Sequence, residues 1–364
     1  MNQLLKNFRD EYLDLLLSFL WRQWSAIGVS GYGDDKDKWI IDPEALLIFT
    51  CTIGRYDPRL FDEVLDWLDT NGRFINIQRL KTIVSLNLFT GDKIISAMAA
   101  LMAERSKFIK WNKLAQNRMN PDTSESLFIQ KDMKPMPAFR SPDDIFLHYG
   151  YVRGKIVFRH HTRPVHTLHN TALIFRLRAL LGVNARSEVF AYLLTHESGH
   201  PRRIAQETFY AQKTIQDLLV DSVHSGLVFV RPAGKEKHYW IKSDEWFHFF
   251  AVNAGKPVKS EWTKNSVFAE SKTIRLPKEP FEHAQWINWP LLLSALEQVW
   301  LKINNKKFLD SAPLLQSSEL RILMQEIKPR IQAAGFAHVL SDDAFFLGEN
   351  YITVFLSDMK ILLG

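Results

Sequence analysis

Apolar positions recur along most of this chain at helical spacing. In residues 13–20, four leucines fall on one face, which predicts an amphipathic helix. The stretches that begin with Asp-Pro at Asp42 and Asp57 each place an N-cap residue before a proline in the first helical turn. Residues 286–335 return to helical spacing, whereas residues 334–358 alternate more like short strands. We therefore expect a mainly α-helical protein.

A different pattern occupies residues 185–242. Three stretches show helical spacing, residues 185–195, 201–209 and 210–224, and Gly226 suits the left-handed residue that ends the third. Residues 227–241 then form two runs rich in β-branched and aromatic residues around a Gly-containing turn, which predicts a β-hairpin. Three helices followed by a hairpin constitute a winged helix-turn-helix, in which the third helix enters the major groove of DNA.

These patterns predict a multidomain, mainly α fold with a central winged helix-turn-helix between a helical N-terminal region and an α+β C-terminal region. Stretches rich in Asn, Met, Pro and Lys predict irregular connectors on either side of the central domain. The expected segments are a helical domain over 1–110, a connector over 111–160, the winged helix-turn-helix over 161–250, a second connector over 251–284, and a helical and α+β domain over 285–364.

The distribution of charge also singles out the centre of the chain. The net charge is +6, but Lys and Arg exceed Asp and Glu by 24 to 14 in residues 101–260. The same counts are 11 to 14 in residues 1–100 and 11 to 12 in residues 261–364. A basic centre between near-neutral flanks favours a polyanionic partner.

The central segment resembles a known family in the order of its residues. Ile204-Ala205, Thr214-Ile215, Leu219 and Gly226 to Val228 match the spacing of winged helix-turn-helix transcription regulators of the MarR and ArsR type. The resemblance covers residues 185–242, less than a fifth of the chain. It implies a bacterial transcription regulator that binds a specific sequence in double-stranded DNA.

Two positions depart from that family pattern. Ser222 stands where those regulators usually carry Leu, and we expect Val223 to take over its packing. Asp217 lies on the face presented to DNA, where a carboxylate can accept from cytosine N4 but is repelled by phosphates.

The resemblance implies roles for the polar residues of this segment. Glutamine amides on the third helix can bond adenine, while its lysine can reach guanine or a phosphate and its threonine a phosphate. Cations in the second helix and in the 231–238 wing are expected to meet the DNA backbone. The predicted DNA-binding residues are Arg202, Arg203, Gln212, Lys213, Thr214, Gln216, Arg231, Lys235 and Lys237.

Two other functions remain open from the residues. Winged helices also dock proteins, so the chain could be a regulatory or neutralising partner of a neighbouring enzyme. Residues His196, Glu197 and His200 fit the HExxH pattern of zinc hydrolases, which requires both histidines on one continuous helix. Gly199 and Pro201 disfavour such a helix, so we expect a turn there.

A second group of histidines, at positions 160, 161, 166 and 169, is expected in a basic polar loop. We therefore predict that the protein is not an enzyme and holds no metal or cofactor.

The single cysteine and the N-terminal sequence bear on location. Cys51 excludes an intramolecular disulfide and suits a reducing compartment; its apolar surroundings predict a core residue. Near the N-terminus only Leu15–Trp21 is free of charge, which is too short to span a membrane. We expect a cytoplasmic protein with no membrane association. A homodimer is the default expectation, because paired half-sites in DNA mirror two-fold symmetry.

Overall fold

The computed structural model is mainly helical, as the spacing predicted. It describes residues 3–31, 39–105, 109–115, 123–137, 141–254, 284–341 and 348–363. The chain divides into two compact units. Unit 1 comprises Met1–Asp35, Asp42–Val165 and Ile287–Gly364, and unit 2 comprises Lys36–Ile41 and His166–Trp286.

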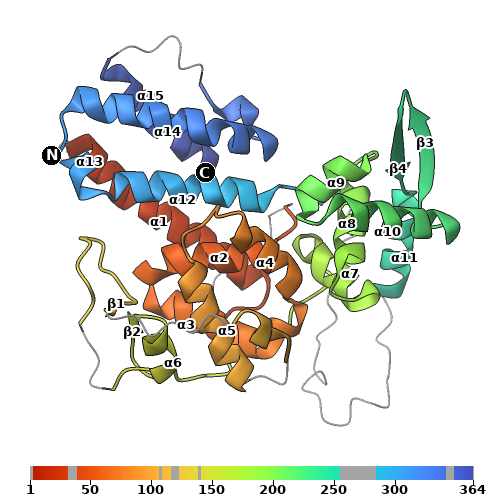
Figure 1. The fold of residues 1–364 in the computed structure, drawn as a ribbon, viewed down its shortest axis with the longest axis horizontal. Coiled ribbons are helices and arrows are strands. Elements are labelled where there is room, and N and C mark those ends of the chain that lie inside the picture. The colour runs from red at the N-terminus through yellow and green to blue at the C-terminus, as the bar shows by residue number, and fades with distance from the viewer. Residues whose placement is uncertain are drawn as a thin grey trace. The chain divides into compact units, whose positions relative to one another are not determined.

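The described part of unit 1 contains helices and one pair of very short strands (Figure 1). Strands β1 (Glu125–Ser126) and β2 (Tyr151–Val152) pair in parallel. The α-helices of unit 1 are α1 (Gln3–Ala26), α2 (Pro43–Ile53), α3 (Pro58–Asn71), α4 (Ile77–Ser85), α5 (Asp92–Arg105), α6 (Asp144–His148), α12 (Trp289–Ile303), α13 (Lys306–Leu309), α14 (Pro313–Ala333) and α15 (Asn350–Leu363). The 3₁₀-helices are η1 (Gly54–Tyr56), η2 (Gly72–Phe74), η3 (Ile109–Lys113) and η7 (Ala337–Val339).

Helix α2 is the buried centre of unit 1. All eleven of its residues are buried, and α1, α4, α5 and α12 pack around it. Its start is the predicted one, because the Asp42 side chain accepts the N–H of Ala45 at 3.0 Å. The Arg79 guanidinium pairs with Asp42 at 2.5 Å and with Glu44 at 2.8 Å, which compensates the burial of both carboxylates.

Helix α3 begins in the same way as α2. Asp57 accepts the N–H of Leu60 at 3.0 Å, and proline occupies the first turn. The two helices end at Gly54 and Gly72, as predicted, and the backbone continues there into a 3₁₀ turn. The Asp-Pro signal therefore located both helices.

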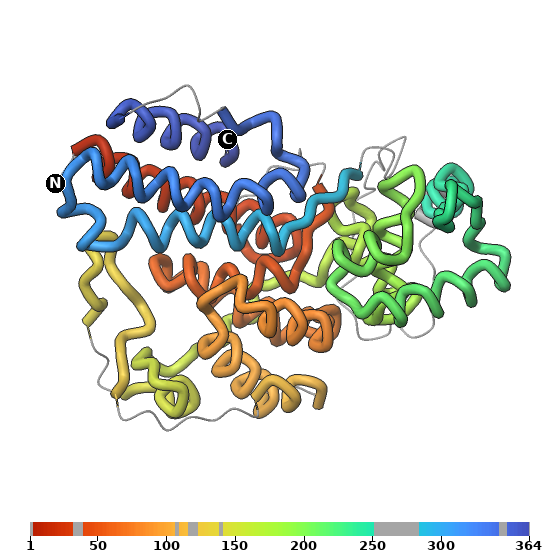
Figure 2. The backbone as a smooth tube through the Cα atoms, turned by 45° about the horizontal axis from the view of Figure 1, so that its top comes forward, coloured from red at the N-terminus to blue at the C-terminus, as the bar shows by residue number. Residues whose placement is uncertain are grey.

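We expected residues 1–110 and 285–364 to form separate domains, but nearly all of both ranges, residues 1–35, 42–110 and 287–364, lies in unit 1. Helix α12 packs on α2 and α1, and the Tyr12 hydroxyl donates to the Leu296 carbonyl at 3.2 Å. Eleven of the fifteen residues of α12 are buried, so this helix needs neighbours on several sides. Helical spacing predicts burial of this kind, but it does not tell which distant segment covers the helix. Figure 2 shows α12 running alongside α14, against which it also packs.

The expected connector over 111–160 is also part of unit 1. Leu127 and Phe146 are fully buried and Arg153 is 2% exposed. Aromatic and aliphatic residues at irregular intervals anchor this stretch, which has no helical period to reveal its burial. Of the second expected connector, 251–284, residues 255–283 lie outside the described part of the chain.

The strand-like prediction for residues 334–358 was wrong. Residues 350–363 form helix α15, and residues 342–347 are not among those described. Tyr351, Phe355 and Met359 are buried at four-residue intervals on one face of α15. The β-branched residues between them favoured a strand locally, but the packing of this face on α14 and α1 stabilises a helix.

Unit 2 contains the predicted central helices and hairpin (Figure 1). Its elements are η4 (Asn170–Ala172), α7 (Leu173–Leu181), α8 (Ala185–Thr195), α9 (Pro201–Thr208), α10 (Gln212–His224), β3 (Phe229–Ala233), β4 (Glu236–Trp240) and α11 (Ser243–Ala254). Helix α7 packs on α8, and the buried Arg178 and Glu188 side chains join them at 2.5 Å. Helix α8 in turn contacts α9 and α10.

Among the described residues, no helix is both long enough and apolar enough to cross a membrane.

Candidate nucleic-acid interface

Helices α9 and α10 are joined by a tight turn. Pro201 occupies the first turn of α9, and the His200 ring accepts the N–H of Arg202 at 3.2 Å. The helix ends at Phe209, which has a left-handed backbone (φ 62°), and the N–H of Tyr210 donates to the Ala205 carbonyl at 3.1 Å. A non-glycine residue at positive φ is uncommon, and burial of the Phe209 ring holds it there. Nothing in the sequence pattern identified this position.

Helix α10 has one narrow buried face. Ile215 and Leu219 are fully buried, and Ser222 is 5% exposed. The Ser222 hydroxyl donates to the Leu218 carbonyl at 2.8 Å, which satisfies it without a polar partner from another element. We expected Val223 to replace Ser222 in the packing, but Val223 is half-buried and Ser222 itself faces inward. The short serine fits because the chain after Gly226 turns back over it, with the N–H groups of residues 227 and 228 donating to its carbonyl at 3.2 Å.

The polar residues predicted to read DNA are all exposed. Gln212, Lys213, Thr214 and Gln216 lie in the first half of α10, away from Ile215. Lys213 also pairs with Asp217 one turn later, at 2.7 Å. Such an exposed pair is worth only about 0.3–0.5 kcal/mol, so Lys213 can leave it for another anion at small cost.

The predicted backbone-contacting cations are exposed as well. In the first turn of α9, Arg202 points to solvent and Arg203 pairs with Glu207 at 3.2 Å. On the hairpin, Arg231, Lys235 and Lys237 are exposed. All nine predicted residues therefore belong to unit 2 and to its accessible surface.

Local charge balance is closer to neutral than the charge of the whole centre suggests. Residues 196–240 contain six Lys and Arg against five Asp and Glu, a net of +1. Asp217 and Asp221 are both exposed, and they are the sixth and the tenth of the thirteen residues of α10. The first five residues, 212–216, contain Lys213 and no carboxylate, so they form the part of this helix best suited to approach an anion.

The hairpin is held in place by its own turn and by backbone hydrogen bonds to the turn between α8 and α9. Strands β3 and β4 are antiparallel, with Arg231 opposite His238, and Gly234 turns the chain at φ 64°. The N–H of Gly199 donates to the Tyr239 carbonyl at 2.8 Å, and the N–H of Tyr239 donates back to Gly199 at 2.9 Å. This bridge ties the α8–α9 turn to the hairpin, and the sequence did not predict it.

The HExxH stretch forms a turn between two helices, as predicted. Helix α8 ends before His196, whose backbone is extended (φ −131°, ψ 147°), and α9 begins after His200. The His196 ring stacks on Tyr192 with centroids 3.8 Å apart, and its Nδ1 lies 2.8 Å from the Tyr192 carbonyl oxygen. Burial lowers the pKa of His196, which favours the neutral ring, while burial raises the pKa of Tyr192 to about 12. The zinc motif requires both histidines on one helix, whereas here they lie in the turn between two helices.

Gly199 has a packing role in this turn. A Cβ on Gly199 would lie 2.7 Å from the Tyr192 ring and 2.8 Å from the Ile204 side chain. Only glycine allows the turn to approach both helices and still pair with β4.

The fold explains the other residues that were candidates for a metal ligand or a nucleophile. His160 and His161 donate their backbone N–H groups to Asp66 at 3.0 Å. Within the described ranges, no group of three His, Cys, Asp or Glu residues is placed to hold a metal ion. Cys51 is fully buried, as predicted for a core residue, and burial raises the pKa of its thiol.

Comparison with known proteins finds no matching family model, and no curated protein or solved structure that is significantly similar to this chain. The resemblance of residues 185–242 to winged regulators therefore stays a prediction from the residues themselves.

Proposed function

We propose that unit 2 is a winged helix-turn-helix that binds double-stranded DNA, and that the protein is a transcription regulator. The observation that carries the proposal is that α10 has one buried apolar face and one exposed polar face. Its inner face is held by Ile215 and Leu219, while Gln212, Lys213 and Gln216 are exposed in its first half. The N-terminal part of a recognition helix is the part that meets base edges.

The neighbouring elements support the same use. The α9–α10 turn and the hairpin beside it have the element order of a winged helix, and β4 is tied to the α8–α9 turn through Gly199. Figure 1 shows the hairpin projecting past the helices of unit 2, which suits a wing that reaches the DNA backbone. Arg231, Lys235 and Lys237 supply its positive charge. A regulator of this kind would bind as a homodimer to paired half-sites.

DNA binding is tested by fluorescence anisotropy over a salt series. The probes are a duplex from the region upstream of the protein's own gene and a scrambled duplex of the same composition. Loss of two phosphate contacts in Arg202→Ala/Arg203→Ala should flatten the slope of log K against log salt by about 2. The variant Gln212→Ala/Gln216→Ala should keep the slope and lose most of the preference for the upstream duplex.

The matched control is Lys306→Ala/Lys307→Ala, which removes two adjacent exposed cations from unit 1. It should bind both duplexes as the wild type does. Absence of binding to either duplex at low salt would reject the proposal. Equal loss in the control and in the arginine variant would show non-specific attraction instead of a defined interface.

A protein-docking role is the second candidate, and one observation favours it. Val220, Leu227 and Val230 are 41–46% exposed, on α10, on the chain after it and on β3. Exposed aliphatic side chains of this kind suit a protein partner better than a phosphate backbone. A photo-crosslinker at Leu227 would then capture one stoichiometric protein in cells, and Val220→Gln/Val230→Gln would abolish the adduct. A protein without DNA affinity that also gives no adduct would exclude both roles.

A further inference from the structure

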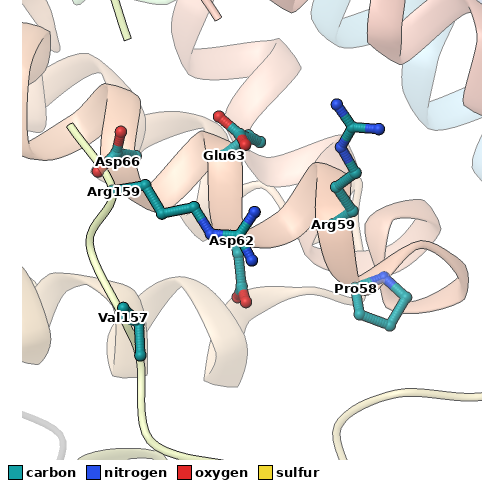
Figure 3. A pocket seen from close by; sticks show the side chains of 7 residues that line it. All are labelled: Pro58, Arg59, Asp62, Glu63, Asp66, Val157 and Arg159. Atoms are coloured by element: carbon teal, nitrogen blue, oxygen red, sulfur yellow. The ribbon is translucent and has the colours of Figure 1, made fainter. Parts of the chain in front are cut away.

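A cavity of about 310 Å³ lies in unit 1, where residues of α3 and of the 157–159 segment line it (Figure 3). Charged side chains line it: Arg59, Asp62, Glu63 and Asp66 come from α3, and Arg159 reaches it from the segment before residue 160. Its volume is at the lower end of the range for small-molecule sites. Which of these charges are already paired within the protein determines which ligand the cavity could bind.

Two of the three carboxylates, those of Asp62 and Asp66, are bound by other groups of the protein. Asp62 pairs with Arg153 at 2.7 Å. Asp66 accepts the backbone N–H groups of His160 and His161 at 3.0 Å and of Thr162 at 3.4 Å. These bonds fix residues 153–162 along α3, so both carboxylates have a structural explanation.

Arg153 makes the Asp62 contact rigid. Its guanidinium is 2% exposed and lies 5.2–5.9 Å from the ring centroids of Phe61, Phe128 and Phe146. Burial, the ion pair with Asp62 and this cation–π packing together hold the guanidinium in place. The charge of Asp62 is therefore matched inside the protein.

Glu63 is different from both of its neighbours. It is only 6% exposed, and its Oε2 atom is buried with no hydrogen-bond partner in the described part of the chain. A buried carboxylate oxygen without a donor costs free energy that most proteins avoid. Because Glu63 lines the cavity, a bound ligand with a cationic donor would remove that cost.

Two guanidinium groups provide the opposite charge at the same cavity. Arg59 and Arg159 are exposed, and Arg59 lies over the Trp21 ring at 5.4 Å. Neither forms an ion pair within the described ranges. Guanidinium groups bind carboxylates in a bidentate manner, so the pair suits an anionic group.

We propose that this cavity binds a small zwitterion of the amino-acid class. The ammonium group of the ligand donates to Glu63, and its carboxylate is bound by Arg59 and Arg159. A dipolar ligand fits because Asp62 and Asp66 are already satisfied, which leaves at the cavity the buried carboxylate of Glu63 and two guanidinium groups that have no ion pair among the described residues. The inference goes beyond DNA binding and does not depend on it.

The test uses probes that share one chain and differ only in their charged ends. The probes are 5-aminopentanoate, pentylammonium and pentanoate, with 4-aminobutanoate and 6-aminohexanoate to vary the spacing of the charges. Isothermal titration to the full-length protein should show millimolar or tighter binding of at least one amino acid. Each singly charged probe should bind at least tenfold more weakly.

Three variants identify the site. Glu63→Gln should abolish the preference for the zwitterion over pentanoate, and Arg159→Gln should weaken zwitterion binding at least tenfold. Lys155→Gln, an exposed cation in the same segment, should leave binding unchanged. Arg159 is exposed, so its variant is informative even if Glu63→Gln fails to fold. The inference is wrong if none of the three amino acids binds at 10 mM, or if Arg159→Gln binds them as the wild type does.

Discussion

Helices α2 and α10 have similar lengths and opposite surroundings. All eleven residues of α2 are buried, whereas only Ile215, Leu219 and Ser222 are buried among the thirteen of α10. Packing explains the sequence of α2 residue by residue, but it leaves most of the α10 sequence unexplained. The exposed polar face of α10 is the part of this helix on which the proposed DNA contact rests. The same contrast holds for ion pairs. Those at the start of α2 are mostly buried, whereas the pair between Lys213 and Asp217 on α10 is exposed.

The largest effect is expected from the buried ion pairs of α2. Replacing Arg79 by Met leaves Asp42 and Glu44 without their cation, and Glu44 is fully buried. We expect Arg79→Met to lower the free energy of unfolding of unit 1 by about 3–5 kcal/mol. Urea unfolding followed by tryptophan fluorescence measures this loss.

The matched variant in the exposed region is Lys213→Met, which breaks the pair with Asp217. Its effect should stay within about 0.5 kcal/mol, because both side chains are exposed to water. Equal losses in the two variants would contradict the distinction between the two helices.

A pH-dependent effect is expected from Glu297 of α12. This side chain is 1% exposed, and burial raises its pKa to about 7, although it accepts two hydrogen bonds from Thr90. A raised carboxyl pKa means that the folded state binds the proton more tightly than the unfolded state. Stability of unit 1 should therefore fall as pH rises from about 4.5 to 7, by up to about 3 kcal/mol.

Glu297→Gln should remove that part of the pH dependence, so that the variant gains on the wild type between pH 5 and 8. The exposed Glu104→Gln serves as control and should track the wild type at every pH. Parallel wild-type and Glu297→Gln curves would mean that the acid is not held protonated by its surroundings.

A loss smaller than that of Arg79→Met is expected from Gly199→Ala in unit 2. The added methyl group would overlap Tyr192 and Ile204, which should cost about 1–3 kcal/mol of stability. Hydrogen exchange at the amide of Tyr239 should speed up, since that amide is bonded to Gly199. Ser198→Ala, one residue away, should change neither quantity, and a neutral Gly199→Ala would show that the turn adapts without loss.

The parts of the fold that could be predicted depend on neighbours in sequence. Asp42 and Asp57 as caps, the helix stop at Gly226 (φ 74°), and the hairpin turn at Gly234 are all local signals. The exposure of the four polar residues on α10, Gln212, Lys213, Thr214 and Gln216, was also predictable, because helical spacing separates them from Ile215.

The features that were missed depend on distant segments. Three such features are the packing of α12 on α2, the Gly199–Tyr239 bridge and the buried Glu63 oxygen that has no hydrogen-bond partner among the described residues. Each arises from residues that only the folded chain brings together. The left-handed backbone of Phe209 is local, but an aromatic residue gives no signal for it, as glycine would. The strand-like pattern that extends into α15 was misleading, because tertiary packing outweighed local β-propensity.

The order of the segments in unit 1 also has a consequence for synthesis. Residues 287–364 complete that unit, yet they are translated after the whole of unit 2. On the ribosome, the half-built core around α2 must wait for α12 with apolar surface exposed, while residues 166–286 can already fold. The contacts between α2 and α12 join residues more than 230 positions apart, so closing this core is the slow step expected of long-range topology.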